Sequence, residues 1–518
     1  MRVTNQMVTS NSLRNMQKSM QRVSGLNQQI TTGKKISAPS EDPVVAIRAL
    51  KLRTTCDQLY QYKNKNIKDA LSWLDTTQTS IQNVFDRLED VYVYCEQGAH
   101  DTFQTPDRNT IINELLALRD HIYAEGGTTY AGRYLFSGYK TETNLIFQDE
   151  AAKQGLSYKI TENIDPKNIE VKNVVLNEID PSKLDDILAR GDYAQPESES
   201  VYRLRLAYDN LDTKETDISI SYTYTRSYTD EDGNLQTVTE TGTIPDEDFT
   251  LNIKQMSESA TYYEVGDDEV NYIPETGELI FGKNVYNKIK TVDNISVEYA
   301  KSEFQVGDLR PEMYFNCTQF KEQPNGDIVP TEFTISENGQ PINYEVNFKQ
   351  YVTVNAEGRE VITHAMGNKI VDLANAVQDV LDIENTIAKL KEMLNDPQYK
   401  DDEKAVAQIN KMLEGADVEL AIKRENMQKL FGNNMTNFQN FMEDVSAVQA
   451  RVGTTYSKVQ LIETRVCEQL DNFEDLKSVN EDIETEEVAI EMYQAELVYE
   501  SALATTASVI QKTLLDYI

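Results

Sequence analysis

The sequence predicts an α+β multidomain protein, with a coiled-coil-like helical bundle formed by both termini and an inserted β-rich outer region. Two observations lead to this fold class. Near both ends, apolar residues recur at alternating steps of three and four, which is the spacing of a helical seam buried against partner helices. Between these ends, about two hundred residues favour strands, because apolar and polar side chains alternate there around turn residues.

The first helix carries an apolar stripe that needs partner helices to bury it. Its members are Leu13, Met16, Met20, Val23 and Ile30, with Asn27 in between. A turn is expected next, because Gly33 can adopt the left-handed conformation that ends a helix and Pro39 prevents its continuation. Asp42 is the expected N-cap of the following helix and Pro43 its first residue.

The second helix is expected to be unusually long. From Pro43 it runs to Gly98, and its heptad stripe comprises Ile67, Leu71, Leu74, Ile81, Phe85 and Leu88. Trp73 lies one position away from this stripe and is interpreted as a packing residue. A third, shorter helix follows Pro106 and ends near Gly126.

The β-rich region follows the aromatic and glycine-rich segment 130–138. One hairpin is predicted to turn at Asp232-Gly233, and a second at Asn338-Gly339 between Ile335 and Ile342. The domain ranges that we expect are an N-terminal helical core at 1–145, the acidic β-rich region at 146–365, and a C-terminal helical core at 366–518 that packs on the N-terminal helices. The middle range is expected to form two lobes, with residues from about 195 to 305 inserted in the other lobe.

Helix is expected to resume near Gly367 and to be interrupted by a loop at Asp396-Pro397. The last helix is predicted to run without interruption from Ser478 to the end, since the segment contains no Pro or Gly. Its stripe is broken by Glu500 and Gln511 and consists of Ile490, Tyr493, Leu497, Ala504, Ala507, Leu514 and Ile518.

Charge is distributed unevenly along the chain. The net charge of −36 argues against nucleic acid as a partner, because phosphate binding needs basic residues. Residues 1–70 hold 12 basic and 4 acidic residues, residues 371–518 hold 13 and 29, and residues 151–350 hold 18 and 38. The opposite signs at the two ends favour docking of the N-terminal helices on the C-terminal ones.

The residues do not suggest an enzyme, a metal site or a cofactor site. His100, His121 and His364 lie in unrelated contexts, and the four cysteines, which form no CxxC, are interpreted as free thiols. Residues 230–233 are interpreted as a β-turn and not as a calcium loop. No run is long and apolar enough for membrane insertion, and the polar N-terminus does not resemble a secretory signal, so any export is expected to proceed without a cleaved signal peptide.

Three segments together resemble the flagellin superfamily, and within it the hook-filament junction family. The first contains Thr32-Gly33-Lys34-Lys35-Ile36 followed by Pro39-Ser40-Glu41-Asp42-Pro43. The second is Gly132-Arg133-Tyr134-Leu135-Phe136-Ser137-Gly138, and the third joins Arg451-Val452-Gly453 to Asp482-Ile483-Glu484 and to the terminal segment 508–518. The resemblance covers roughly residues 1–145 and 430–518.

This resemblance implies a structural subunit of the extracellular bacterial flagellum that assembles between the hook-associated protein beneath it and the filament above. Implied partners are further copies of the chain in a ring, the neighbouring hook-associated protein, flagellin and an export chaperone. The expected polymerisation residues are Leu13, Met16, Met20, Val23, Ile30, Ile490, Leu497, Leu514 and Ile518. Two alternatives stay open at this point, a filament flagellin and a secreted adhesin carried on a helical stalk.

Overall fold

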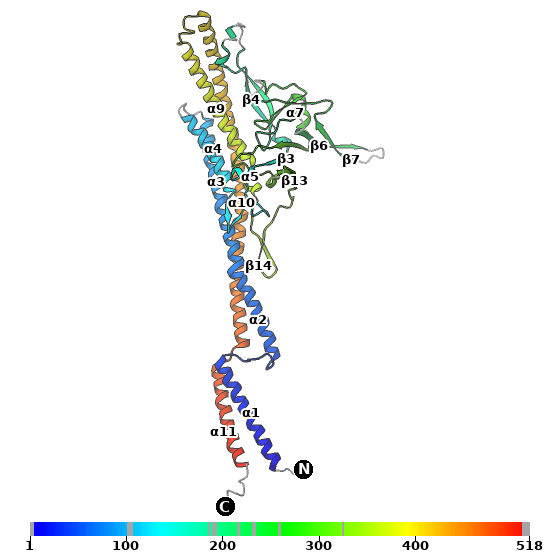
Figure 1. Cartoon of the computed structure of the whole chain (residues 1–518), viewed down its shortest axis with the longest axis vertical. Helices are drawn as coiled ribbons and strands as arrows, with labels where there is room; N and C mark the ends of the chain where they lie inside the picture. The colour runs from blue at the N-terminus through cyan, green and yellow to red at the C-terminus, as the bar shows by residue number, and fades with distance from the viewer. Residues whose placement is uncertain are drawn as a thin grey trace, which may run out of the picture. The chain divides into compact units, whose positions relative to one another are not determined.

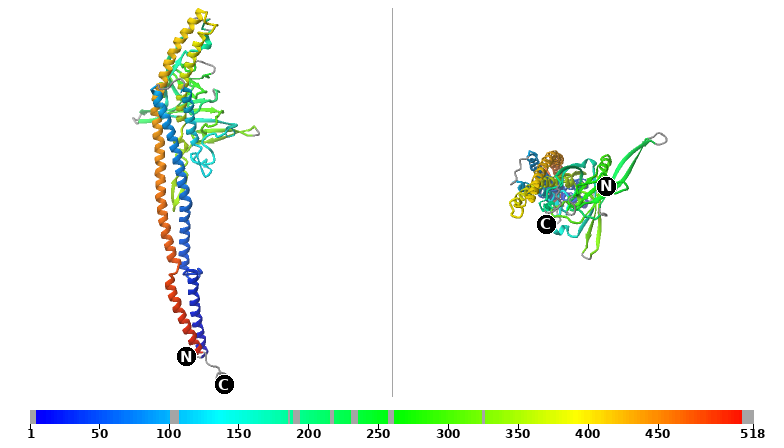
Figure 2. Two further views of the ribbon diagram at one scale, coloured as in Figure 1. Left: turned by 90° about the vertical axis from the view of Figure 1, so that its left-hand side faces the viewer. Right: turned by 90° about the horizontal axis from the view of Figure 1, so that it is seen from above.

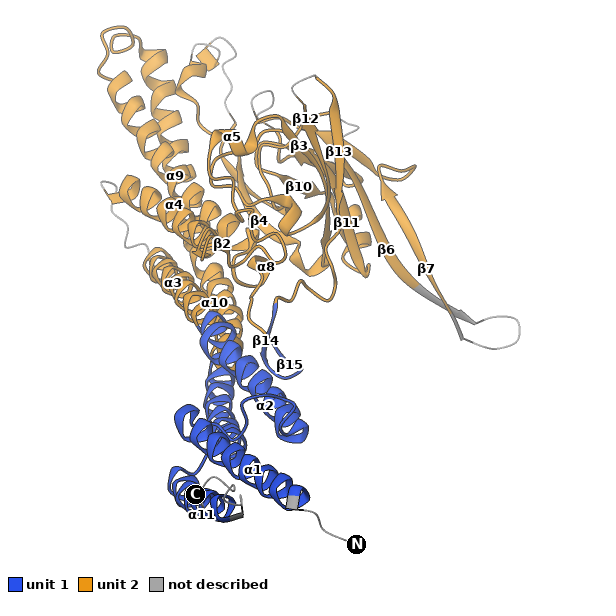
Figure 3. Cartoon of the chain, turned by 60° about the horizontal axis from the view of Figure 1, so that its bottom comes forward, with its two compact units in different colours: residues 1–71, 343–352, 456–518 blue, residues 72–342, 353–455 orange. Residues whose placement is uncertain are grey.

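The structure is a computed structural model that describes residues 5–100, 107–184, 187–188, 194–214, 218–229, 235–256, 261–323 and 326–509. Helices from the two terminal parts of the chain and a β-rich middle part are both present, so the predicted α+β class is confirmed. The chain divides into two compact units (Figure 3). Unit 1 comprises residues 1–71, 343–352 and 456–518, and unit 2 comprises residues 72–342 and 353–455.

Unit 1 is built from helices of both ends of the chain. Helix α1 (Asn5–Thr32) lies alongside α11 (Thr485–Val509), as Figures 1 and 2 show. Helix α2 (Pro43–Gln61) continues through one π-helical turn, η1 (Tyr62–Asn66), into α3 (Ile67–Ala99). The last part of α10 (Glu403–Glu481) belongs to unit 1 from residue 456 onward. The sequence indicated the long helical run but not its π turn.

The packed face of α1 is rotated from the predicted stripe. Reduced exposure recurs at Thr9, Ser12, Met16, Ser19, Val23, Leu26 and Ile30. Met16, Val23 and Ile30 were expected on this face, whereas Leu13 and Met20 are exposed. Polar Ser12 and Ser19 take those places because they follow the same steps of three and four as the apolar residues. Within the single chain, the five stripe residues therefore do not share one buried face, and their burial against neighbouring copies stays a prediction.

The prediction that the last helix runs without interruption from Ser478 is wrong. Helix α10 ends at Glu481 and α11 begins at Thr485. Between them, Asp482 forms an antiparallel bridge with Lys34, and the amide of Ile483 donates to the carbonyl of Gly33 at 3.1 Å. These main-chain bonds to a distant segment replace helical ones, and no Pro or Gly is needed for such a break.

A small hairpin completes unit 1. It consists of β14 (Asn343–Asn347) and β15 (Gln350–Thr353), which pair through a turn at Phe348-Lys349. The hairpin lies against η1, where the ring of Phe348 meets that of Tyr62 edge-on at 5.4 Å and Asn66 donates to the carbonyl of Glu345 at 2.8 Å. No sequence feature predicted this hairpin.

Unit 2 contains two sheets whose strands alternate along the chain. One has the order β4-β5-β10-β9-β8, with strands Glu170–Leu176, Glu197–Arg205, Glu278–Phe281, Glu269–Ile273 and Thr250–Ile253. The other has the order β13-β12-β3-β11-β6-β7, with strands Ile328–Phe333, Asn316–Glu322, Leu156–Ile164, Asn294–Lys301, Ile218–Thr229 and Leu235–Ile244. Only β8 and β9 pair in parallel among the described strand pairs.

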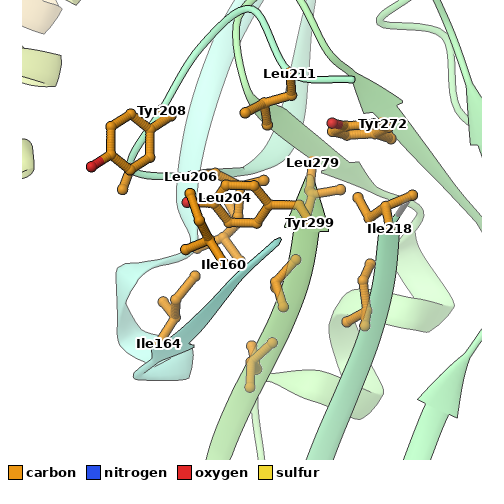
Figure 4. Close-up of a cluster of buried hydrophobic side chains, with 14 of the residues drawn as sticks. Ile160, Ile164, Leu204, Leu206, Tyr208, Leu211, Ile218, Tyr272, Leu279 and Tyr299 are labelled. Carbon is orange, nitrogen blue, oxygen red and sulfur yellow. The ribbon is translucent and has the colours of Figure 1, made fainter. Parts of the chain in front are cut away.

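Both sheets contribute to one apolar core, which Figure 4 shows in close-up. Ile160, Ile220 and Tyr299 come from the second sheet, whereas Leu279 and Tyr272 come from the first. Helix α7 (Lys283–Ile289) adds two further side chains, Val285 and Ile289. The alternation of apolar and polar residues along β11 places every second side chain in this core.

The predicted hairpin of β6 and β7 is confirmed by their antiparallel pairing, although residues 230–233, where the β-turn was predicted, lie outside the described residues. The second predicted hairpin is wrong. Residues 337–338 do form a turn, but no paired strands flank it, because the amide of Ile342 donates to Asn355 Oδ1 at 2.7 Å and the amide of Val354 donates to the carbonyl of Ile342 at 3.0 Å.

Four helical segments accompany the sheets in unit 2. They are α4 (Arg108–Glu125), α9 (His364–Met393), the part of α10 up to residue 455 and the part of α3 from residue 72. Shorter elements are β1 (Thr129–Tyr130), β2 (Arg133–Tyr134), α5 (Glu150–Lys153), α8 (Gly358–Val361), η3 (Pro166–Asn168), η4 (Pro181–Lys183) and η6 (Pro311–Met313). The loop expected near Asp396 lies between α9 and α10, as predicted.

Trp73 of α3 is a packing residue, as predicted. Its side chain is fully buried, and its ring meets Tyr130 edge-on at 6.1 Å. The guanidinium carbon of Arg133 lies 4.9 Å from the ring centre, which adds a cation–π contact. The glycine-rich segment after α4 therefore packs against α3.

A buried ionic cluster joins the first sheet to α9. Asp372 of α9 pairs with Arg203 and Arg205 of β5, and Arg203 also lies 3.2 Å from Glu278 of β10. All four side chains are almost completely buried, so each charge needs the others. The arginine pairs hold the pKa of Asp372 well below its usual range in spite of burial.

Candidate assembly site

The turn between α1 and α2 has the geometry that the sequence predicted. Gly33 has φ +68°, in the left-handed region, and no atom lies within 4 Å of the position that a Cβ would take. Asp42 Oδ1 accepts hydrogen bonds from the amides of Val44 at 2.9 Å and Val45 at 3.1 Å, directly before Pro43. Pro39 lies within the turn.

The break between α10 and α11 lies against this turn. The amide of Lys35 donates to the carbonyl of Glu481 at 2.8 Å, and Asn480 Nδ2 donates to the carbonyl of Val45 at 3.2 Å. Together with the bond from Ile483 to Gly33, these contacts tie the two breaks to each other. We refer to residues 33–42 and 481–484 together as the joint.

Two basic side chains in and beside the joint contact the same carboxylate, that of Glu481. Glu481, whose side chain is 6% exposed, accepts from Arg53 Nε at 2.7 Å and Nη2 at 2.6 Å, and Lys34 Nζ lies 3.4 Å away. Lys34 also pairs with Asp482. The hydrogen bonds from Arg53 lower the pKa of Glu481, and those from Lys34 and Ser478 lower the pKa of Asp482. Basic N-terminal and acidic C-terminal residues therefore pair, as the charge distribution predicted.

The apolar residues predicted for polymerisation divide into two groups. Met16, Val23 and Ile30 are partly buried in the pair of α1 and α11. By contrast, Leu13, Met20, Ile490 and Leu497 are 39%, 56%, 59% and 65% exposed. The face of α11 with reduced exposure instead carries Val488, Met492, Ala495, Tyr499, Ala502 and Thr506. Leu514 and Ile518 lie outside the described residues.

Exposed apolar side chains are concentrated in unit 1. Of the large apolar residues that are exposed in the described part of the chain, most belong to unit 1, although unit 2 is the larger of the two. The members on its helices are Met7, Val8, Leu13, Met20, Val44, Ile47, Leu50, Tyr60, Leu461, Leu476, Val479, Ile490, Tyr493, Leu497, Val498 and Leu503. A concentration of exposed apolar side chains is typical of an interaction site.

Sequence reasoning did not single out Lys34, Arg53 and Glu481, which hold the joint together. Lys34 was noted only as part of a motif. The opposite charges of the two ends were the available signal, but charge balance does not identify which residues pair. Exposed Val44, Ile47 and Leu50 were also missed, because the heptad stripe predicted for this long helix begins only at Ile67.

No cluster of His, Cys, Asp and Glu among the described residues could hold a metal ion. His364 is buried among Tyr208, Tyr314 and Phe315, and burial lowers its pKa to about 3. All four cysteines are free, as predicted. The helices among the described residues include none long and apolar enough to cross a membrane.

Comparison with known proteins agrees with the helical arrangement of the first part of the chain. Residues 3–141 match the family model of the bacterial flagellin N-terminal helical region. The N-terminal helical region is therefore similar to that of bacterial flagellin. The resemblance that the sequence motifs indicated is thus confirmed over these residues.

Two relatives each match about a third of this chain. They are the flagellar hook-associated protein 3 of Escherichia coli strain K12, 29% identical over 172 residues, and that of Salmonella typhimurium strain LT2, 28% identical over 172 residues. Each match covers 32% of this chain and 52% of the relative, so the match spans about half the length of each of these relatives. The solved structure of hook-associated protein 3 from Legionella pneumophila is 12% identical, with 83% of this chain and 98% of that chain covered and a TM-score of 0.30.

Proposed function

We propose that this protein is a structural subunit of the bacterial flagellum that joins the hook-associated region to the filament by polymerising through its terminal helices. The single observation that carries the proposal is the exposed apolar surface of α1 and α11, including Met20 and Leu497, in a chain whose N-terminal region is similar to that of bacterial flagellin. The names of the two matched relatives, both flagellar hook-associated proteins, support a place in that part of the flagellum. The role needs no catalytic residue, metal or cofactor.

The physical argument concerns burial. Met20, Ile490 and Leu497 are each more than half exposed in the single chain. Apolar surface removed from water contributes about 25 cal/mol per Å², so neighbours that cover these side chains stabilise the assembly. The predicted stripe residues of α11 lie on the outer face and not on the α1 face, as contacts between subunits require. Leu514 and Ile518 continue the same spacing in the sequence.

The partners that follow are other copies of the chain in a ring, the neighbouring hook-associated protein on one side and flagellin on the other. An extracellular position requires export, for which we propose passage of the unfolded chain through the flagellar type III channel with the help of a chaperone. Both β-sheets of unit 2 and their acidic surroundings would face the solvent in such an assembly. Repulsion between acidic surfaces would keep them soluble.

Electron microscopy of a strain that lacks the gene tests the proposal. We expect hooks without filaments and flagellin released into the culture medium. Normal filaments would exclude the junction role and favour an adhesin, and loss of the filament protein itself would favour a filament flagellin.

The same strain allows the surface to be tested by complementation. The double variant Met20→Asp and Leu497→Asp should fail to restore filaments, because two charges would enter an apolar contact. The double variant Leu514→Asp and Ile518→Asp should fail in the same way and leave the β-rich region folded. Val171→Asp is a matched control, since Val171 of β4 in unit 2 is 62% exposed and lies outside the proposed contact.

A further inference from the structure

Unit 2 contains a cavity of about 680 Å³ beside its six-stranded sheet. The residues that line it come from segment 134–156, from segment 310–312 and from strands β12 and β13. Asn144 and Glu312 are buried in its lining, whereas Glu142 and Lys321 are exposed, so the cavity opens to solvent. Cavities of this size commonly hold small ligands in proteins.

Main-chain hydrogen bonds hold together the two loop segments that line the cavity. Ile146 forms an antiparallel bridge with Leu309, and the amide of Arg310 donates to the carbonyl of Leu145 at 2.9 Å. The lining residues immediately before and after these pairs are therefore held on main chain whose position is fixed. Such support is what a binding site needs, because it keeps the side chains in place before a ligand arrives.

Three polar atoms in the cavity lining are buried and unpartnered. Nδ2 of Asn144, Nε of Arg310 and Oε2 of Glu312 form no hydrogen bond with any described residue. Asn144 is 5% exposed and Glu312 is 8% exposed. Buried polar atoms are normally hydrogen-bonded, so three such atoms in one cavity indicate a shared polar partner.

The remaining atoms of these side chains are engaged, which fixes how the unpartnered atoms point. Asn144 Oδ1 accepts a hydrogen bond from the amide of Ile146 at 3.3 Å. Arg310 Nη1 lies 3.4 Å from Glu312 Oε1, and the guanidinium carbon of Arg310 lies 4.5 Å from the ring centre of Phe147. These contacts leave two N–H donors and one carboxylate acceptor available to a ligand.

Other side chains around the cavity are paired with each other. Lys140 Nζ lies 3.6 Å from the ring centre of Phe333, and Gln319 Nε2 donates to the hydroxyl of Tyr158. Burial and the nearby charge of Glu312 raise the pKa of Tyr158, but its hydroxyl does not meet hydrogen-bond geometry with Oε2 of Glu312. The acceptor of Glu312 therefore stays available.

The charged residues of the lining balance each other. They are Lys140, Arg310 and Lys321 against Glu142, Asp149 and Glu312. A lining without excess charge favours a neutral ligand over an anion or a cation. A hydroxyl group both donates and accepts hydrogen bonds, so a ligand with several hydroxyls satisfies donors and a carboxylate acceptor at the same time.

We propose that this cavity binds a short neutral carbohydrate, whose hydroxyls accept hydrogen bonds from Asn144 and Arg310 and donate one to Glu312. The proposal adds a ligand-binding role to unit 2. It does not depend on the proposed role at the junction, because that role rests on the helices of unit 1.

A glycan array tests the ligand class. Labelled full-length protein is applied to neutral oligosaccharides of glucose, galactose, mannose and N-acetylglucosamine, presented beside sialylated and sulfated glycans. We expect binding to neutral glycans and none that requires a sialic acid or a sulfate. Isothermal titration calorimetry with the neutral oligosaccharide that gives the strongest signal then measures the affinity.

Two nearly isosteric variants test the residues. Asn144→Asp keeps the acceptor for the amide of Ile146 but loses the Nδ2 donor, and Glu312→Gln loses the charged acceptor. Each should weaken binding about tenfold or more, because each removes a buried hydrogen bond to the ligand. Thermal unfolding of both variants shows whether their fold is kept.

Matched controls make the same chemical changes outside the cavity. Asn316→Asp alters an asparagine whose Oδ1 also accepts a main-chain amide, that of Ile335 at 2.8 Å. Glu322→Gln alters an exposed glutamate of β12. Neither residue lines the cavity, so both variants should bind like the wild type.

A variant at the opening tests the site without touching its buried groups. Ala151 is exposed and lines the cavity, so Ala151→Trp should obstruct entry and weaken binding with no loss of stability. Gln154→Trp is its control, since Gln154 is exposed nearby but does not line the cavity.

Three outcomes would overturn the proposal. The first is an array on which no neutral glycan is bound or only anionic ones are. The second is unchanged affinity in Asn144→Asp and Glu312→Gln, which would mean that water alone satisfies the three buried atoms. The third is unchanged affinity in Ala151→Trp, which would place the bound glycan elsewhere on the protein.

Discussion

Arg53 in α2 and Glu481 at the end of α10 form a two-point ion pair, with Nε and Nη2 at 2.7 Å and 2.6 Å from the two carboxylate oxygens. A bidentate pair fixes the orientation of both groups as well as their distance. The pair therefore holds the end of α10 next to α2 at the level where the turn after α1 begins. It gives a physical reason why the two helical breaks occur together.

Replacing Glu481 by Gln should loosen the joint. The neutral amide lacks the negative charge with which Arg53 and Lys34 interact. We expect the joint to lose about 1 to 2 kcal/mol of stability. This value is at the lower end for charged hydrogen bonds, because Arg53 is 55% exposed and can bind water instead. Hydrogen exchange at the amides of Lys35 and Ile483 should accelerate accordingly. Glu484→Gln, at an exposed position three residues later, should leave both amides unchanged.

The effect of Glu481→Gln should depend on pH. Arg53 lowers the pKa of Glu481 in the folded chain, so its contribution to stability is complete above the pKa of an unfolded glutamate, about 4.3, and disappears as the pH falls through the folded value. The exchange rates of variant and wild type should therefore converge in acid. A difference that persists unchanged at low pH would show that the charge of Glu481 is not what holds the joint.

The turn itself can be tested at Gly33. Because the position of a Cβ is free of contacts, Gly33→Ala should be destabilising only through its positive φ, by about 1 to 2 kcal/mol. Thermal unfolding and proteolysis of residues 33–42 measure the change. Gly25→Ala is the matched control, since it also meets no atoms but lies within α1, where Ala is more stable than Gly by up to about 1 kcal/mol. Equal effects of the two substitutions would contradict the argument.

Local signals in the sequence predicted those parts of the fold that depend on neighbours in the chain. Gly33, Asp42 and Pro43 define the turn after α1, because capping and left-handed glycine act over a few residues. Alternation along residues 218–224 and 235–239 defined the hairpin of β6 and β7 for the same reason. The short helix expected between Pro106 and Gly126 is likewise present as α4, since the residues at its ends act over the same short range.

Features set by distant residues escaped prediction. The break after Glu481 depends on Arg53 and Gly33, which are more than four hundred positions away in sequence, and residues 482–484 themselves are compatible with helix. Which face of α1 is buried could not be predicted for a related reason. Both stripes on α1 have heptad spacing, and the partner helix α11 decides which of them is buried, so Leu13 and Met20 face outward. For the candidate site residues, the sequence indicated apolar stripes but not which face each stripe takes in the folded chain.

Asp372 of α9 is expected to be the costliest single position in the buried ionic cluster of unit 2. Asp372→Asn would leave Arg203 buried with one fewer counter-charge, and losing one partner of a buried ion pair costs about 3 to 5 kcal/mol. Urea unfolding should detect the loss in the transition of unit 2. Asp382→Asn, on the exposed side of the same helix, should change stability by less than about 1 kcal/mol. A small loss at Asp372 would mean that water reaches the arginines.

Glu162 of β3 should make the stability of unit 2 fall between mildly acidic and neutral pH. Burial raises its pKa from 4.5 to about 7, although the amide of Ala207 at 3.0 Å and the hydroxyl of Tyr299 at 2.9 Å both donate to Oε2. The folded chain thus holds a proton that the unfolded chain releases above pH 4.5. The contribution of Glu162 to stability is complete below that value and decreases as the pH rises through about 7, where the folded carboxyl also ionises.

The variant Glu162→Gln removes this titration. Its free energy of unfolding should therefore rise relative to that of the wild type as the pH is raised from 5 to 8, as measured by urea unfolding of both proteins across that range. Glu332→Gln, at an exposed position of β13, should follow the wild type at every pH. If Glu162→Gln also follows the wild type, the carboxyl is ionised throughout and the donors from Ala207 and Tyr299 outweigh its burial.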